Sequence, residues 1–259
     1  MTTPRWRPAA DAVWLAGHDS TDGKPVLQPE TLATGLAAAL LAELVIRQWI
    51  TVDPQTRDEA ARIRLRAPES CGHLEPVEGC PVCPLVTWNL GDAAEQAVLD
   101  GLRRRLREVW SASADRTRIP TQDLQTWIRY MQEPADRRYL DRPVTELVEQ
   151  RLSAAGVIHQ VERGLIRRKL VWAPRNSADA GGATKTIGLK FRERASLAPD
   201  DFLLTALVFA IGLDAAAFDL LKPAERDELK KRALLALPEP LQVLLLTTQS
   251  IHHKAVLIR

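Results

Sequence analysis

The residues best suited to chemistry lie in one short stretch, where three cysteines and a histidine fall within thirteen residues. Thiolates and imidazoles are preferred zinc ligands, and a two-residue gap lets both sulfurs of a tight turn face one tetrahedral ion. We therefore predict a closed structural zinc site, a staple rather than a catalyst. Its ligands would be Cys71, His73, Cys80 and Cys83.

Two other interpretations of these cysteines stay open. Cys80 and Cys83 could form a redox pair, although no strand clearly precedes them, or the thiols could have no role. The weak point of the zinc interpretation is His73, which lies only two residues from Cys71. Another side chain, such as His18, could supply the fourth ligand.

A second chemical feature is a concentration of positive charge between His159 and Ala195. Nine Lys and Arg residues face three Asp and Glu residues there, giving +6 locally in a chain whose formal charge is +2. Trp172 and Phe191 interleave with the cations. Such a patch suits an anionic membrane surface or nucleic acid, whereas the plain alternative is a solvated hairpin with its aromatic rings in the core.

Motifs of catalysis are missing from the sequence. It contains no Gly-x-Ser-x-Gly, no phosphate-cradling glycine loop and no His-Glu-x-x-His. We therefore expect a protein that is not an enzyme.

The elements that must position these groups are mostly helical. The run Leu32–Arg47 is apolar on nearly all sides, so it must be surrounded by other elements. It is too short and too interrupted to span a bilayer, which needs about 20 apolar residues, and we interpret it as the buried axis of a soluble domain. A short strand, Trp49–Val52, follows.

Other patterns complete a mainly α fold with small hairpins. An amphipathic helix over Asp141–Leu152 precedes two strands, Val157–Val161 and Leu165–Trp172, which turn at Arg163-Gly164. Further helices are expected over Asp92–Val109, from Pro120 past Trp127, and over Asp200–Leu213 and Ala224–Ala236.

Composition favours one soluble domain. The chain has 46% apolar and 26% charged residues, as ordinary globular proteins do. We expect a disordered tail over residues 1–10 and a single domain over 11–259, with the Cys/His insert at about 67–86. No signal peptide is visible, and three clustered cysteines cannot form a disulfide framework. These features predict a cytoplasmic protein.

Five segments in order resemble the Golgi phosphoprotein 3 family, whose studied members are peripheral membrane adaptors. They cover roughly residues 12–220 and suggest a divergent, bacterial member. The segments are Gly35-Leu36 with Ala42–Arg47, Leu90-Gly91-Asp92, Leu124–Ile128, Arg151–Ile158 and Phe202–Ala210.

The resemblance implies a headgroup site for phosphatidylinositol 4-phosphate, built from one tryptophan and three arginines. Here the tryptophan position is Gln28 and the first arginine position is Ala37, while the last pair falls on Arg142 and Thr145. One cation of three remains, which removes most charge-assisted hydrogen bonds to a monophosphate. The family's membrane contact also uses the hairpin.

We therefore predict a non-enzymatic cytoplasmic adaptor, peripheral on the inner membrane face, that binds anionic phospholipid or phosphoinositide headgroups loosely. An oligomer is compatible with this role, and protein partners are unknown. One alternative is a winged-helix-like DNA-binding regulator, although we favour nucleic acid less than a membrane as the partner. Another alternative is a zinc-stabilised interaction scaffold. The predicted lipid-binding residues are Arg142, Arg167, Arg168, Lys169 and Trp172.

Overall fold

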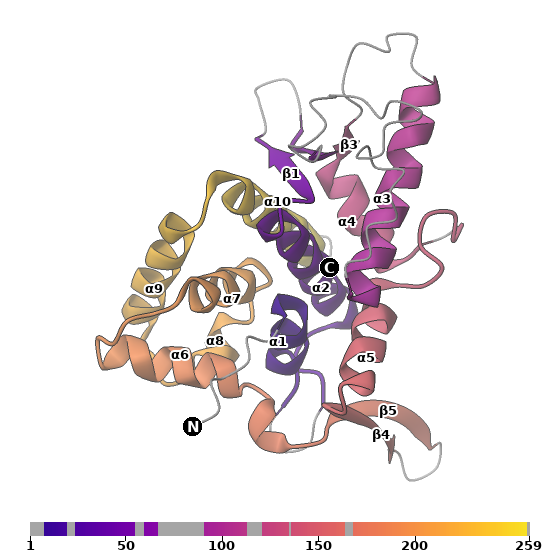
Figure 1. Cartoon of the computed structure of the whole chain (residues 1–259). Helices are drawn as coiled ribbons and strands as arrows, with labels where there is room; N and C mark the ends of the chain where they lie inside the picture. The colour runs from indigo at the N-terminus through magenta and orange to yellow at the C-terminus, as the bar shows by residue number, and fades with distance from the viewer. Residues whose placement is uncertain are drawn as a thin grey trace.

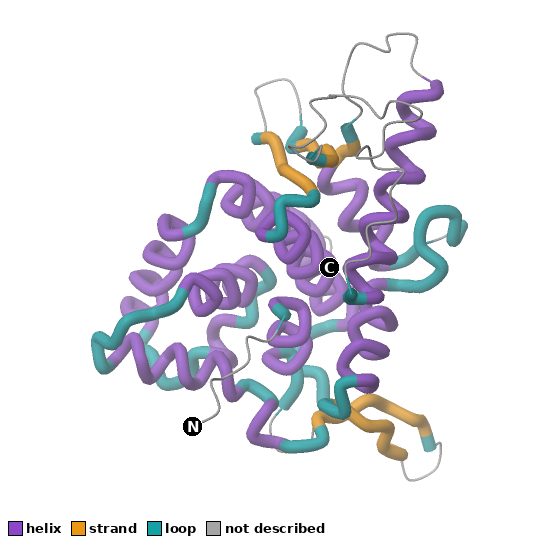
Figure 2. Tube along the Cα trace, viewed as in Figure 1, coloured by secondary structure: helices purple, strands orange, loops and turns teal. Residues whose placement is uncertain are grey.

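The computed structural model describes residues 8–19, 24–54, 60–66, 91–112, 121–134, 136–163 and 168–257. Helices make up the body, and strands lie at two opposite edges of it (Figure 1 and Figure 2). The predicted mainly α fold with small antiparallel strand pairs is confirmed. The helices are α1 (Ala9–Ala16), α2 (Pro29–Ile46), α3 (Ala93–Ala112), α4 (Leu124–Gln132), α5 (Val144–Ala154), α6 (Gly182–Arg192), α7 (Pro199–Ala210), α8 (Asp214–Ala217), α9 (Pro223–Ala236) and α10 (Glu239–Leu257).

Helix α2 is the axis of the fold, as its composition predicts. Its residues from Leu32 to Leu44 are all buried, and α1, α4, α5, α7 and α10 pack around it. Pro29 opens the helix, where a missing N–H costs nothing. By length and hydropathy α2 could also cross a bilayer, but 72% of it is buried inside the fold. This burial supports its role as a core helix.

The strands form two small sheets. Strands β1 (Ile50–Asp53), β2 (Arg62–Leu65) and β3 (Gln122–Asp123) form an antiparallel sheet in that order. Strands β4 (Ile158–Arg163) and β5 (Lys169–Pro174) form a separate hairpin, paired from Ile158↔Pro174 to Arg163↔Lys169. This hairpin follows α5 directly and projects from the body (Figure 1).

Several boundaries differ from the sequence prediction. Ala9 and Ala10 already belong to α1 and are buried, so the tail predicted for residues 1–10 extends too far. Residues 12–15 belong to the same helix. The helix expected from Pro120 begins at Leu124, because Gln122 and Asp123 pair with β2 and Asp123 then caps α4.

The basic segment after the hairpin contains a helix that the sequence analysis did not predict. Residues 177–179 form a short 3-10 turn and 182–192 form α6, within the stretch for which the sequence indicated only positive charge. Only Thr184, Ile187 and Gly188 of α6 are buried. The basic region is therefore divided between the hairpin and α6.

Candidate lipid-binding site

The tip of the β4–β5 hairpin combines positive charge with an exposed apolar side chain. Arg168 and Lys169 are exposed, and Leu170 is 64% exposed. Arg168 pairs with Glu162 across the hairpin at 3.1 Å, but both side chains face solvent, where such a pair contributes little. Arg167 lies outside the described residues. The described end of the hairpin thus presents one exposed leucine directly after two exposed cations.

Trp172 occupies a different environment from Leu170. Alternate residues of a strand share a face, so both side chains leave β5 on the same side. Trp172 is partly buried and packs against the core, whereas Leu170 lies two residues nearer the end of the hairpin. Trp172 therefore attaches the base of the hairpin to the core. Leu170 is the exposed apolar side chain of β5, and the sequence analysis did not include it among the lipid-binding residues. A leucine directly after three consecutive basic residues was the available signal in the sequence.

Arg142 lies at the opposite end of α5 from the hairpin. It is partly exposed and directly precedes Pro143, the N-cap of α5, which provides no side-chain cap. Among the described residues Arg142 forms no hydrogen bond or ion pair. Uncapped N–H groups and the helix dipole favour an anion at this end of the helix, and Arg142 adds a formal charge.

The other family positions do not assemble around Arg142. Gln28 lines a cleft of about 490 Å³ at the start of α2, together with Arg129 and Lys254, but Arg142 is not part of its lining. Ala37 is fully buried. Thr145 is partly exposed and supplies no charge. Of these four positions, Arg142 alone provides a cation.

A buried charged cluster holds the elements that carry these groups. The Arg151 guanidinium on α5 donates from Nε to Asp11 Oδ1 at 2.7 Å and from Nη1 to Glu43 Oε2 at 3.0 Å. The same Nη1 lies 3.3 Å from Asp92 Oδ2. Asp92 Oδ1 meanwhile accepts from the first amides of α3. Arg151 thus ties α1, α2, α3 and α5 together directly beneath the hairpin.

Burial shifts the pKa values of this cluster. Desolvation raises the pKa of Asp11 to about 6, although Arg151 opposes the shift. Burial and then the neighbouring Glu43 raise the pKa of Glu95 to about 8, while Arg47, 3.1 Å away, acts in the opposite direction. Burial alone would lower the pKa of Arg151, but the carboxylates around its guanidinium raise this pKa overall. Arg151 therefore stays charged.

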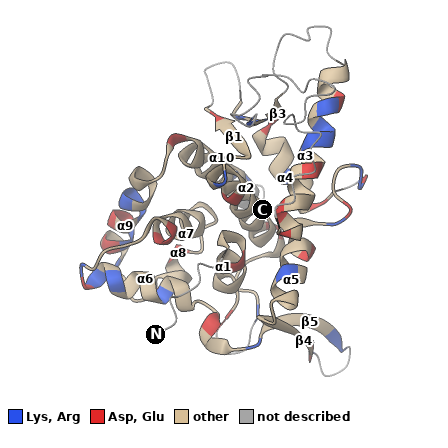
Figure 3. Cartoon of the chain, viewed as in Figure 1, with Lys and Arg blue, Asp and Glu red and all other residues tan. Residues whose placement is uncertain are grey.

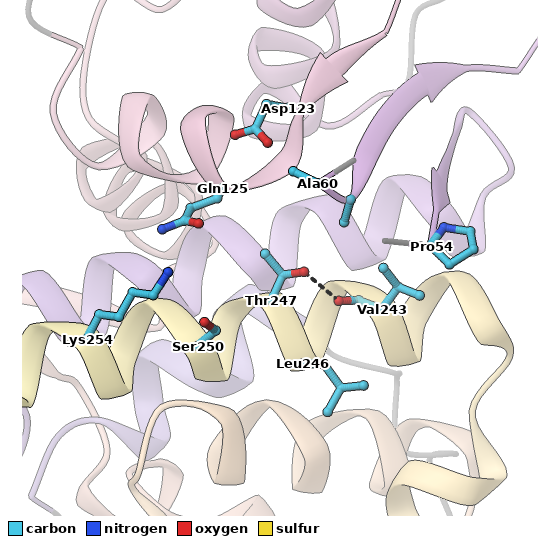
Figure 4. Close-up of a pocket in the computed structure, with 10 residues that line it drawn as sticks. Pro54, Ala60, Asp123, Gln125, Val243, Leu246, Thr247, Ser250 and Lys254 are labelled. Carbon is cyan, nitrogen blue, oxygen red and sulfur yellow. Dashed lines mark hydrogen bonds between the residues drawn. The ribbon is translucent and has the colours of Figure 1, made fainter. Parts of the chain in front are cut away.

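A second cleft, of about 370 Å³, lies between α10 and the start of α4 (Figure 4). Thr247, Ser250 and Lys254 of α10 face Asp123 and Gln125 across it. Two of these polar groups make structural hydrogen bonds: Asp123 Oδ1 accepts from Thr126 N at 2.6 Å, and Thr247 Oγ1 donates to the Val243 carbonyl at 2.9 Å. Its lining contains no cysteine or histidine and no nucleophile paired with a base.

All four predicted zinc ligands, Cys71, His73, Cys80 and Cys83, lie outside the described residues, so this site stays a prediction. Within the part that the structure describes, no group of three or more His, Cys, Asp or Glu residues could hold a metal ion. His18, the alternative ligand, is buried, stacks on Trp14 and donates from Nδ1 to the Trp14 carbonyl at 2.6 Å. Metal analysis of the purified chain would test the zinc prediction.

The buried axis, the helix-and-hairpin unit and the exposed basic tip define a helical protein with a projecting surface hairpin. Residues 9–243 match the family model described as Golgi phosphoprotein 3 (GPP34). This match covers most of the chain, which therefore belongs to that family. No curated protein matches the chain.

Proposed function

We propose that this chain is a non-enzymatic adaptor that docks reversibly on anionic membranes through the β4–β5 hairpin. The observation that carries the proposal is the hairpin tip, where Leu170 is 64% exposed beside the exposed Lys169 and Arg168. Cations near an anionic surface each contribute about 1 kcal/mol, and an inserted leucine adds apolar burial of about 1.5–3 kcal/mol. Family membership is consistent with a peripheral adaptor.

The proposed lipid preference is for negative charge in general rather than for one phosphoinositide. Ala37 and Thr145 provide no cations at positions where the resembled site needs them, and Arg142 is the one inherited arginine. A single guanidinium can pair with many headgroups but does not select among phosphate positions. Accordingly, we propose a cytoplasmic location on the inner membrane face.

The test is co-sedimentation with vesicles of neutral lipid, of neutral lipid mixed with phosphatidylserine, and of neutral lipid mixed with phosphatidylinositol 4-phosphate. We expect binding to both acidic compositions, decreasing as salt increases. Lys169→Glu and Leu170→Glu should each reduce the partition constant at least about fivefold. Lys231→Glu, the same charge change at an exposed site on α9, should bind like the unmodified chain.

Two results would contradict the proposal. One is equal sedimentation of the Leu170→Glu and Lys231→Glu variants, which would show that the hairpin is not the contact. The other is no binding to any vesicle, combined with salt-dependent binding to duplex DNA, which would favour the winged-helix alternative.

A further inference from the structure

A third cleft, of about 690 Å³, lies where α6 ends and the chain turns into α7, against the side of α9. It is distant in the fold from the hairpin tip, and Figure 3 shows Lys and Arg residues at this end of α6 and on α9. Three arginines, Arg192, Arg194 and Arg232, contribute to its lining.

The charge of the lining is positive. The three guanidinium groups stand against one carboxylate, Glu225, which leaves +2. Glu225 is already engaged, because its Oε2 accepts from the Lys222 amide at 2.7 Å. Asp201 next to the cleft is neutralised by Lys190 Nζ at 2.9 Å. Outside the lining, Glu228 pairs with Arg232 at 2.8 Å, which reduces the net charge of the cleft to +1.

Arg194 occupies a position that usually belongs to glycine. Its φ is +55°, and the amides of Arg194 and Ala195 bond back to the carbonyls of Phe191 and Lys190 at 3.1 and 2.8 Å. This is the Schellman ending of a helix, in which a residue without Cβ is favoured at the left-handed site. Glycine would close α6 equally well, so the helix ending does not require the arginine.

The remaining lining suits the body of a ligand. Phe191, Leu197 and Phe202 are partly buried and form an apolar floor. The Arg232 guanidinium lies 5.4 Å from the centre of the Phe191 ring, and its Nε donates to Glu228 Oε1 at 2.8 Å. Both contacts orient its fork. A guanidinium fork matches phosphate oxygens bidentately, and an aromatic surface accommodates a planar or apolar group.

We propose that this arginine cleft binds a phosphate monoester, with Arg194 and Arg232 as the ligand-contacting cations and Phe191 beneath the attached organic group. The monoester could be a free phosphorylated small molecule or the headgroup of a lipid such as phosphatidic acid. The shared chemistry is a terminal dianionic phosphate. This site is independent of the hairpin and of the membrane docking proposed above.

The experiment measures binding of adenosine monophosphate by calorimetry and binding to vesicles containing either phosphatidic acid, a monoester, or phosphatidylglycerol, a diester. The decisive variant is Arg194→Gly, which keeps the helix ending. We expect its melting temperature to stay equal or rise while its affinity for the monoester falls about tenfold. Arg232→Ala should lose affinity similarly, and Lys231→Ala, its exposed neighbour on α9, should not.

The outcomes separate the two sources. Binding of adenosine monophosphate that depends on Arg194 supports a free ligand, whereas an Arg194-dependent preference for phosphatidic acid over phosphatidylglycerol, without binding of the free compound, supports a lipid headgroup. Failure of both probes, or equal affinity of Arg194→Gly and the unmodified chain, overturns the proposal. Leu170→Glu should leave adenosine monophosphate binding unchanged, so failure of the membrane proposal is distinguishable.

Discussion

At the scale of single residues, Arg151 is the side chain on which most of the buried polar structure depends. It is almost fully buried and pairs with three carboxylates from three different segments. Glu43 has an additional partner, because its Oε1 accepts from the Ala10 amide at 2.7 Å. Removing one partner of such a network leaves unpaired charges in a medium that solvates them poorly.

Arg151→Met should therefore destabilise the chain by about 3–5 kcal/mol, because it leaves the buried carboxylates of Glu43 and Asp11 without their cationic partner. Urea unfolding would measure this loss. The matched control is Arg138→Met, because Arg138 is 63% exposed and pairs with Glu108 at the surface. That control should cost less than about 1 kcal/mol. Similar losses for the two variants would show that the buried cluster is not the stabilising element.

Glu95 should make stability depend on pH. Its pKa is about 8 in the folded chain against an ordinary value of 4.5, so the folded state keeps a proton that the unfolded state releases. This contribution to stability is fully present below the ordinary value and is lost as the pH rises through about 8. Asp11, with a pKa of about 6, adds a similar loss at lower pH.

Glu95→Gln mimics the protonated form and should flatten the fall in melting temperature between about pH 4.5 and pH 8. Thermal unfolding across this range is the measurement. Glu228→Gln, at an exposed position on α9, should retain the pH profile of the unmodified chain. Parallel profiles of melting temperature against pH for Glu95→Gln and the unmodified chain would contradict the raised pKa of Glu95.

At the scale of elements, the contact between α3 and the segment before α5 is unusually close. A Cβ added to Gly101 would lie 2.6 Å from the Tyr139 carbonyl oxygen, a backbone atom that cannot rotate away. Tyr139 is also fixed by its hydroxyl, which donates to Glu108 of α3. This contact positions the chain that leads to Arg142.

Gly101→Ala should accordingly push the two segments apart and destabilise the chain by about 1–3 kcal/mol, although alanine is the better helix former. Chemical denaturation would show whether the free energy of unfolding falls. Gly182→Ala in the first turn of α6 is the matched control, because no atom lies within 4 Å of its added Cβ. That change should be neutral or stabilising by about 0.4–1 kcal/mol. Stabilisation by both substitutions would contradict the close approach.

At the scale of the whole molecule, two basic surfaces arise from one basic stretch of sequence. The hairpin carries Lys169 and Arg168, whereas the end of α6 carries Arg192 and Arg194. Because they lie on different elements, each can be changed without touching the other. The adaptor and monoester proposals therefore stand or fall separately.

Local pattern determined much of the fold. The buried helix α2 follows from apolar residues on all sides of Leu32–Arg47, and α9 begins at Pro223, one residue from the predicted Ala224. The hairpin was predicted from two β-prone segments, but its turn was placed too early, because Arg163 still belongs to β4 and pairs with Lys169. These features depend on neighbours in sequence, so periodicity and turn residues suffice to predict them.

Only the tertiary structure decided which charges are buried together and which are free. Arg151 and Asp11 are 140 residues apart, and no local pattern reports that they meet. Glu43 alone gave a hint, as a single acid inside an apolar helix. Likewise, Trp172 and Leu170 share a strand face, yet one packs on the core and the other faces solvent, because burial depends on where the hairpin leaves the body. Sequence therefore determined the elements, while packing between distant segments decided the environment, and hence the chemistry, of each charged group.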